Sequence, residues 1–402
     1  MNALHPTNDS ERLLFRQVYE TLVRVDCEGR VAPALAVSWR LDTDGRTWLL
    51  KLRDDARFAD GAPVSAADVK AGWTRDESVD ELRLHVRRFA ESVVAVSPTE
   101  LAITLRGKPQ DAPLALAHPD LVIARRVADS SWPVGTRPVR VTPDRDAVVV
   151  ANPDNGLSIR FLVAPGDPRD LLDKGVDLVL TRDPATLEYA ATLPQFQAVP
   201  LAWQRTHVLL TPGRSRESRQ LSEDARRALA DDAVRGEAMG AAGPFWWQDL
   251  DCAVPAPQLP GQSARPSGRV VYDAADGAAR DLAERLVGIA SASGPGATAM
   301  LDALIPDRPR RTFQRATGLT GEPLALARRR GTDAAYVVAI DRRPLDACRD
   351  VQVLMEGTRW LDPATMIPLV DTRLQAIARR GRSRVTKEWD GGLLLAGASD
   401  QR

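Results

Sequence analysis

The sequence has few cysteines, and their spacing indicates neither a metal site nor a disulfide framework. Cys27, Cys252 and Cys348 lie far apart, and no CxxC pair is present. Neither a structural zinc site nor a set of disulfide bonds is therefore predicted. An odd number of cysteines also leaves at least one thiol outside any intramolecular disulfide.

An excess of charge of one sign is also missing. Lys and Arg together number 54, and so do Asp and Glu. No overall field attracts the chain to nucleic acid or to an anionic membrane surface, so nucleic acid is not expected as a partner. Arginine clusters, such as those in 308–311, 328–330 and 379–384, could form a phosphate site, but nearby acidic residues favour a solvated surface.

Long apolar runs are absent as well. No stretch approaches the roughly 20 apolar residues that span a bilayer. The start, MNALHPTNDSERL, is polar and does not have the basic and apolar regions of a signal peptide. Taken literally, this indicates a cytoplasmic protein if Met1 is the true start. A chain whose leader precedes Met1 would look the same and would be periplasmic or extracellular.

The usual catalytic and cofactor motifs are not found either. The four histidines, His5, His85, His118 and His207, are scattered and form no HExxH or His-x-His pattern. GxSxG, the P-loop and a strand-associated GxGxxG are also missing. No catalytic residue, metal ligand or cofactor is therefore predicted, although a triad assembled only in space stays open.

The chain does have the size and composition of a soluble globular protein. Its 402 residues are 27% charged and 44% hydrophobic, which favours two or three domains. Helical spacing of apolar residues predicts a first helix over 10–25. A DTDGR turn between two runs of alternating apolar and polar residues predicts an antiparallel hairpin. Ser65, followed three residues later by Asp68, predicts the capped start of a helix.

The pattern changes near residue 157. Before it, short alternating runs predict a β-rich region with antiparallel pairing. After it, apolar runs and amphipathic segments alternate, which predicts α/β packing. Two separate strands are expected at 195–201 and 206–212, followed by a helix that begins near Ser222.

The region from Val18 to Trp73 closely resembles family 5 of the extracellular solute-binding proteins, which are the peptide, dipeptide and nickel receptors of ABC importers. The resemblance depends on many ordered matches rather than on one motif. The matching residues are Tyr19, Glu20, Leu22, Asp26, Gly29, Pro33, Leu35, Ala36, Ser38, Trp39, Asp44, Gly45, Trp48, Leu52, Arg53, Phe58, Asp60, Gly61, Pro63, Ala67, Asp68 and Val69.

Weaker likenesses continue along the chain. WPVGTRPVRV resembles the family's P-x-GTGPY loop, with Arg137 in place of the second glycine and Val139 in place of the tyrosine. SEDARRALADDAVR, MIPLVDTRLQAIARR and EWDGGLLL resemble later family segments. Against the family pattern, the chain is expected to be truncated at its N-terminus and shortened in its second lobe.

The resemblance implies an α/β, two-lobe periplasmic-binding-protein-like fold with mixed sheets and a hinged interlobe cleft. The first-lobe core is expected at 1–36, 151–211 and 361–402, with a β-rich subdomain at 37–150 and the second lobe at 212–360. The implied function is capture of a peptide or similar small solute for a membrane permease of an ABC importer, by a monomer without enzymatic activity. A ligand-sensing module of a regulatory protein is the alternative.

Candidate ligand-binding residues follow from position and from the resemblance. Trp203 and Arg205 precede a predicted crossover and could face the cleft, although Trp203 could equally pack between sheet and helix. Trp246 and Trp247 are adjacent in a glycine-containing loop, where both cannot face one core, so one is expected as a cleft wall or lid. A purely structural role for the pair stays open.

The other candidates come from the family pattern. Thr7 and Asn8 follow the first turn, which contributes ligand contacts in relatives, but a frayed terminus is the alternative. Tyr19 matches a family element that is mainly architectural. Asp341 follows an apolar strand and could meet a ligand amine, or could be a surface aspartate.

Overall fold

The computed structural model describes a chain that divides into two compact units. Unit 1 comprises residues 1–171 and 381–402, and unit 2 comprises residues 172–380. The described residues are 9–25, 30–76, 81–83, 86–106, 112–127, 132–154, 156–162, 166–212, 221–233, 238–239, 268–304, 313–319, 334–341, 364–381, 385–388 and 392–395.

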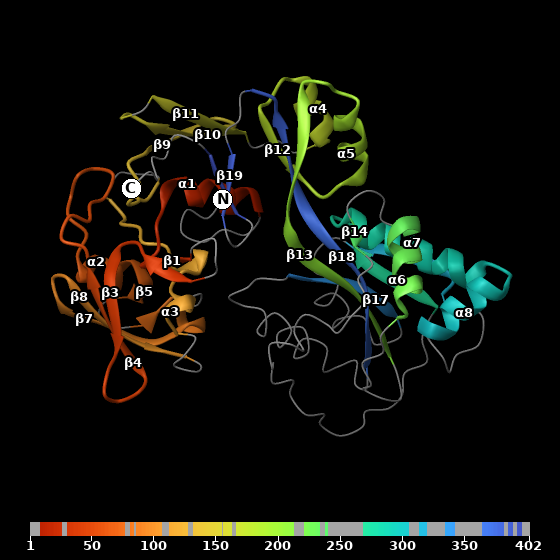
Figure 1. Ribbon diagram of the computed structural model, residues 1–402, viewed down its shortest axis with the longest axis horizontal. Helices are drawn as coiled ribbons and strands as arrows, with labels where there is room; N and C mark the ends of the chain where they lie inside the picture. Colours follow the sequence, from red (N-terminus) through yellow and green to blue (C-terminus); the bar gives the residue numbers. More distant parts are fainter. Residues whose placement is uncertain are drawn as a thin grey trace. The chain divides into compact units, whose positions relative to one another are not determined.

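Unit 1 is built from short helices and small antiparallel sheets (Figure 1). Its elements are α1 (Asp9–Val18), β1 (Val23–Val25), β2 (Val31–Pro33), β3 (Ala36–Leu41), β4 (Thr47–Leu52), α2 (Ala66–Trp73), β5 (Thr74–Asp76), β6 (Glu81–Leu82), β7 (Ala90–Ser97), β8 (Glu100–Leu105), α3 (Ala112–Ala115), β9 (Arg140–Asp144), β10 (Ala147–Asn152), β11 (Leu157–Leu162), β19 (Val385–Lys387) and β20 (Leu393–Leu395), with 3-10 turns at Val86–Arg88 and Pro119–Leu121.

The main sheet of unit 1 has the order β3-β4-β8-β7. The expected hairpin is confirmed: Trp39 pairs with Leu50, and Leu41 pairs with Trp48. Gly45 closes its turn at φ 68°, a conformation that suits glycine because it has no Cβ. The capped helix is also confirmed as α2, where Ser65 and Asp68 exchange side-chain and backbone hydrogen bonds.

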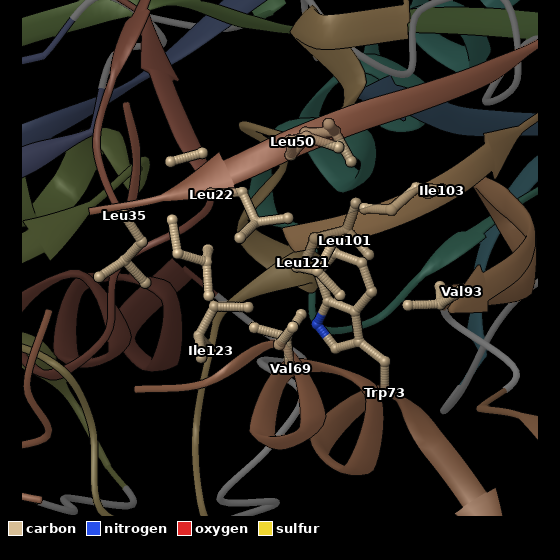
Figure 2. Close-up of a cluster of buried hydrophobic side chains, with 14 of the residues drawn as sticks. Leu22, Leu35, Leu50, Val69, Trp73, Val93, Leu101, Ile103, Leu121 and Ile123 are labelled. Atoms are coloured by element: carbon tan, nitrogen blue, oxygen red, sulfur yellow. The ribbon is translucent and has the colours of Figure 1, made fainter. Parts of the chain in front are cut away.

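The inner face of this sheet and α2 enclose the core of unit 1. Figure 2 shows the indole of Trp73 among Leu101, Ile103 and Leu121. Trp73 is only 1% exposed. Strand alternation explains the arrangement, because every second residue of β4 and β8 points to the same face.

The first helix is shorter than expected. α1 ends at Val18, whereas the sequence predicted helix to residue 25. The backbone of Glu20 instead forms a β-bridge with Ile123, and β1 pairs with β2. Tertiary strand pairing therefore overrides the helical spacing of the apolar residues. The β-branched side chains of Val23 and Val25 also favour a strand over a helix.

Unit 2 is organised around one mixed sheet of seven strands in the order β12-β18-β13-β17-β15-β16, with β14 also paired to β18. Its elements are β12 (Leu178–Thr181), α5 (Pro184–Ala191), β13 (Phe196–Pro212), α6 (Glu223–Ala233), β14 (Ala238–Met239), β15 (Arg269–Asp273), α7 (Gly277–Ser291), α8 (Pro295–Leu304), β16 (Arg315–Leu319), β17 (Ala335–Asp341) and β18 (Ala364–Arg379). The helix α4 (Pro168–Asp173) contains the boundary between the two units.

The longest strands of unit 2, β13 and β18, run side by side as an antiparallel pair (Figure 1). The prediction of two strands at 195–201 and 206–212 was wrong, because β13 is continuous through both. Irregularities in the pairing between Pro200 and Arg205 let the ladder continue past a proline that has no N–H to donate.

The compact units differ from the expected lobe boundaries. Contacts assign β12, β13 and β18 to unit 2, whereas the sequence placed 151–211 and 361–402 in the first lobe. These strands join unit 2 because they pair with one another and with β17 in a single sheet. The boundaries of functional lobes, as distinct from these units, stay a prediction.

Candidate ligand-binding site

The best-defined polar cluster lies where β13 meets the start of α7, inside unit 2. Nε2 of His207 is 3.1 Å from Oδ2 of Asp276, and the guanidinium of Arg205 is 3.7 Å from the same oxygen. Arg205 and His207 are two positions apart on one strand, so their side chains leave the same face. The cluster therefore joins one face of β13 to a helix terminus.

Asp276 holds this cluster in place through two roles. Its Oδ1 accepts a hydrogen bond from the backbone N–H of Ala279 at 3.1 Å, which caps α7. Burial by itself raises the pKa of Asp276, but His207, Arg205 and the cap bond together bring that pKa well below its usual value. Since the carboxylate is ionised and can only accept, Nε2 of His207 must carry the donated proton.

His207 itself is fully buried, with 0% exposure. On its other side the hydroxyl of Thr372 lies 3.5 Å from Nδ1. The ring thus has a polar neighbour at each nitrogen, which fixes its orientation in the sheet. This arrangement indicates a positioning role for His207 rather than direct contact with a solute.

The opposite face of the same strand carries a second buried polar pair. The hydroxyl of Thr206 donates to Oδ1 of Asp371 on β18 at 2.6 Å, and the two residues are directly opposite in the ladder. Arg226 on α6 is buried nearby; burial lowers the pKa of its guanidinium, and the charge of Asp371 partly offsets this. Polar groups on both faces therefore fix the register of β13 against β18.

Trp203 lies at the irregular part of the β13–β18 ladder. It pairs with Arg373, whose guanidinium carbon lies 4.5 Å from the centre of the indole ring. The side-chain amide of the next residue, Gln204, accepts a hydrogen bond from Arg182 at 3.0 Å. Trp203, Gln204 and Arg205 are each half-buried, so this part of the strand is accessible to solvent.

Of the predicted ligand residues, the structure brings together Trp203 and Arg205 on β13. The backbone of Asp341 lies in β17 directly opposite Arg205 in the ladder. Tyr19 is elsewhere: it is 2% exposed in unit 1 and packs edge-on against Phe15. Burial raises the pKa of the Tyr19 hydroxyl, so it stays protonated. Thr7, Asn8, Trp246 and Trp247 lie outside the described residues, and ligand contact by any of these residues stays a prediction.

Sequence reasoning did not single out His207, Asp276, Asp371 or Arg373. The sequence around Asp276 does contain a helix-start signal. In DAADGAARDL an aspartate lies immediately before an amphipathic helix, as expected of an N-cap residue. No pattern identified His207 or Asp371. Their importance depends on partners more than 60 positions away in the chain.

The loop in which Arg137 replaces a family glycine is held against the end of α1. A Cβ on Gly135 would lie 2.1 Å from the backbone oxygen of Val18, so only glycine fits there. Nε of Arg137 donates to the backbone oxygen of Tyr19 at 3.4 Å. Arg137 thus has a structural contact in unit 1. Glu20, another residue that matches the family pattern, lies 3.8 Å from Arg53.

Within the described residues, no group of three or more His, Cys, Asp or Glu side chains could hold a metal ion. Among the described helices, none is long and apolar enough to cross a membrane.

The comparisons with solved structures concern nearly the whole chain. The fold matches NikA from Brucella suis in complex with Fe(III)-EDTA with a TM-score of 0.61, at 18% identity, over 95% of this chain and 93% of that one. It matches the Escherichia coli murein tripeptide binding protein MppA with a TM-score of 0.56, at 13% identity, over 97% and 93%. The chain thus has the two-lobe α/β fold of periplasmic binding proteins, as predicted.

Residues 30–158 match the family model described as bacterial extracellular solute-binding proteins, family 5 Middle. These residues are a family 5 solute-binding segment, and the recognition of this family from the sequence is confirmed. The predicted truncation and shortened second lobe stay predictions.

The curated relatives match over shorter segments. The Nickel-binding periplasmic protein of Escherichia coli K12 is 36% identical over 127 residues, which is 30% of this chain and 24% of that protein. The Periplasmic oligopeptide-binding protein OppA of the same strain is 40% identical over 70 residues, or 17% and 12%. The matched sequence therefore spans about a quarter or less of the length of these relatives.

Proposed function

We propose that the chain is the substrate-binding component of an ABC import system. It binds a peptide or a similarly small solute and presents it to a membrane permease. The observation that carries this proposal is the family 5 match of residues 30–158, and the fold of the remaining chain is consistent with it. Relatives named as nickel-, oligopeptide- and glutathione-binding proteins support a solute of this size.

In the proposed function the protein binds a solute and makes or breaks no covalent bond. Aromatic and guanidinium groups that are half-buried supply contact area and hydrogen bonds to a small polar ligand. Trp203 and Arg205 on β13 combine both kinds of group on one short stretch. Thr7, Asn8, Tyr19, Trp246, Trp247 and Asp341 are the further ligand-contact candidates. The protein acts as a monomer in the periplasm or outside the cell, next to its permease.

The binding function is tested on the purified full-length chain. Native mass spectrometry detects solute retained from expression, and thermal-shift measurements screen short peptides, nickel–histidine complexes and glutathione. We expect one class to raise the melting temperature, because binding only to the folded state stabilises it. Failure of every class to bind, with no retained solute, would contradict the proposal.

A variant then tests the assignment of the site. Trp203→Ala should weaken binding of the solute found in the screen by about tenfold, in the range of aromatic hot-spot residues. Trp48→Ala, in unit 1, is the matched control and should leave the affinity unchanged. An equal loss in both variants would show that Trp203 acts through general stability.

The transport role needs a test in cells. Cells that lack the gene should lose uptake of the radiolabelled solute, and expression of the wild-type chain should restore it. Fractionation should find the protein in the periplasmic or membrane-associated fraction. Normal uptake without the gene, together with a cytoplasmic protein, would favour a sensing role instead.

A further inference from the structure

We propose that the C-terminal hairpin formed by β19 and β20 is a latch on α1. When shut, the latch anchors the returning end of the chain in unit 1, and it opens as one piece while the remainder of unit 1 stays folded. The proposal goes beyond solute binding and does not depend on it. Its basis is the polar contacts between α1 and the hairpin, the small amount of apolar burial in the hairpin and the separate core behind α1.

The hairpin lies in the part of the chain that returns to unit 1. Unit 1 contains residues 1–171 and 381–402, so unit 2 is an insertion that the chain enters once and leaves once. β19 and β20 pair with each other after the second crossing and lie against α1 (Figure 1). When the latch is shut, the second end of the insertion is therefore anchored in unit 1. When the latch is open, that end leads only to an undocked segment.

The side-chain amide of Gln17 on α1 contacts β20 as a neighbouring strand would. Its Nε2 donates to the backbone oxygen of Leu393 at 3.0 Å, and its Oε1 accepts from the backbone N–H of Leu395 at 3.1 Å. Nε2 also donates to the backbone oxygen of Leu13, one turn earlier in α1, at 2.9 Å. Gln17 is 5% exposed. Because both N–H groups of the amide have partners, its orientation toward β20 is fixed.

The neighbouring residue of α1 makes a second set of contacts with the hairpin. Arg16 forms an ion pair with Glu388, which directly follows β19. The backbone N–H of Glu388 donates to the backbone oxygen of Gly392 at 2.8 Å, next to the start of β20. A Cβ on Gly392 would overlap the guanidinium group of Arg16, so glycine allows the close approach. Residues beside both strands of the hairpin are therefore held by α1.

Little apolar burial holds the hairpin in place. Of its side chains that the structure describes, that of Leu393 is buried, at 2% exposure, and those of Thr386 and Lys387 are exposed. A two-stranded hairpin by itself is at best marginally stable in water. The shut state therefore depends on α1, and its opening does not require the core of unit 1 to unfold.

α1 has a core of its own on another side. Leu14, Phe15 and Val18 are each 1% exposed. They belong to a cluster of buried side chains whose other members are Tyr19, Ala124, Trp132, Val148 and Val150. Since β9, β10 and the 118–139 region of unit 1 supply the packing around this cluster, α1 keeps its place when the hairpin leaves.

The start of the latch is set where the chain leaves unit 2. Arg380 is the last residue of unit 2, and its backbone N–H donates to the backbone oxygen of Gln195 at 2.8 Å. Its Nε donates to the backbone oxygens of Pro194 and Phe196, each at 3.2 Å. Gly381 follows at φ 75°, a conformation that favours glycine. Because Arg380 is fixed within unit 2, opening of the latch should extend back to Gly381 and no further.

Hydrogen exchange of the full-length chain, measured by NMR, tests whether the hairpin opens as one piece. The N–H groups of Glu388 and Leu395 have different acceptors, so equal opening constants for the two indicate one opening event. We expect this opening constant to be at least about tenfold larger than that of the Tyr19 N–H, which bonds to Phe15 at the end of α1. Equal protection of the hairpin and Tyr19, or different opening constants for Glu388 and Leu395, overturns the proposal.

Gln17→Leu tests the contact that shuts the latch. Leucine is of similar size but has no amide, so β20 loses two hydrogen bonds and the opening constant should rise about tenfold. The rise should be as large at Glu388, whose N–H bonds to Gly392, as at Leu395. The N–H of Arg380, in unit 2, should keep its wild-type exchange rate.

Arg12→Ala is the matched control on the same helix. Arg12 lies one turn before Arg16 and pairs with Asp9 at 3.0 Å, so its truncation should leave the opening constant of the hairpin unchanged. Gly392→Ala acts from the side of the hairpin. Its Cβ should displace Arg16 from Glu388 and raise the opening constant about threefold, the size expected for loss of a partly exposed ion pair.

The outcomes separate the latch from general stability and from solute binding. An unchanged opening constant in Gln17→Leu overturns the proposal, and so does a rise at Leu395 alone, which would show fraying of one strand end. An equal rise at Tyr19 also overturns it, because Gln17 would then act on the stability of α1. No solute is needed for these measurements, so failure of the latch leaves the proposed binding function standing, and failure of every solute to bind leaves the latch standing.

Discussion

In unit 1, β3 pairs with β4 and β7 with β8, strands separated only by short turns, and the core beneath them is apolar. In unit 2, β13 pairs with β18, and the residues that meet across that ladder, such as Thr206 and Asp371, are 165 positions apart. Buried polar groups accompany this distant pairing. The comparison teaches that the β3–β4 and β7–β8 hairpins are specified by local pattern and apolar burial, whereas the β13–β18 ladder also needs polar contacts to fix the register of distant strands.

The largest expected effect is on the apolar core of unit 1. Trp73→Ala should lower the free energy of unfolding by about 4 kcal/mol, because it removes a large side chain from a closely packed site. Urea unfolding measures the loss. Hydrogen exchange should localise it to α2, β7 and β8, whose residues share the core cluster with Trp73, rather than to β13 and β18.

Val96→Ala is the control for this change. Val96 is 56% exposed on β7 of the same sheet, so its truncation should change the free energy of unfolding by about 0.5 kcal/mol or less. A similar loss in Trp73→Ala would show that the core of unit 1 is not held by apolar burial.

The second effect is on the polar network of unit 2. Asp276→Ala removes the carboxylate partner of the buried His207 and the cap of α7, and should cost about 3 kcal/mol. Asp276→Asn keeps a capping side chain and should cost about 1 kcal/mol less than the alanine variant. Urea unfolding of both variants, with hydrogen exchange at the start of α7, measures the difference. Equal losses of unfolding free energy in the two variants would show that the capping bond of Asp276 does not stabilise α7.

A smaller effect is expected from pH. The folded-state pKa of Asp276 lies below its unfolded value of about 3.9, so its contribution to stability is present above that value and is lost as pH falls toward the folded pKa. Between pH 7 and pH 3, the stability difference between wild type and Asp276→Asn should therefore shrink by about 1 kcal/mol. Urea unfolding of both proteins at the two pH values measures this. A difference that grows on acidification would contradict the assigned direction.

An effect of similar size is expected at a local signal in unit 1. Ser65→Ala removes the side chain that caps α2 and should cost about 1 kcal/mol in the free energy of unfolding. Ser65→Asn, which can still cap, should recover most of it. If both substitutions cost the same, the sequence signal at Ser65 and Asp68 would mark the helix start without stabilising it.

Predictions from the sequence were correct for contacts between neighbouring residues and wrong where the contacts join distant segments. The Trp39–Leu50 hairpin, the Ser65 cap and the family segment were predicted because each depends on neighbours within a short stretch. The extension of α1 beyond Val18 and the break in β13 were wrong. Both depend on strand partners from distant parts of the chain, which helical spacing and turn residues do not reveal.

The candidate site shows the same limit. Trp203 and Arg205 could be proposed from their place in the sequence, but Arg373, Asp276 and His207 could not. Periodicity predicts which side of a strand a residue occupies, but it does not predict which distant side chain will lie opposite. The bonds of Asp276 with His207 and the stack of Arg373 on Trp203 exist only once the ladder has its register.

By itself, the sequence predicted the family 5 segment, the local hairpins and helix caps of unit 1, and two residues that the structure places together on β13. Turn residues, capping pairs and alternating apolar side chains act over a few positions, so their effects can be predicted without the fold. Only the tertiary structure decided that β13 runs unbroken beside β18 and that Asp276 reaches His207. These contacts depend on closure of long chain segments, which becomes favourable only when many distant contacts form together.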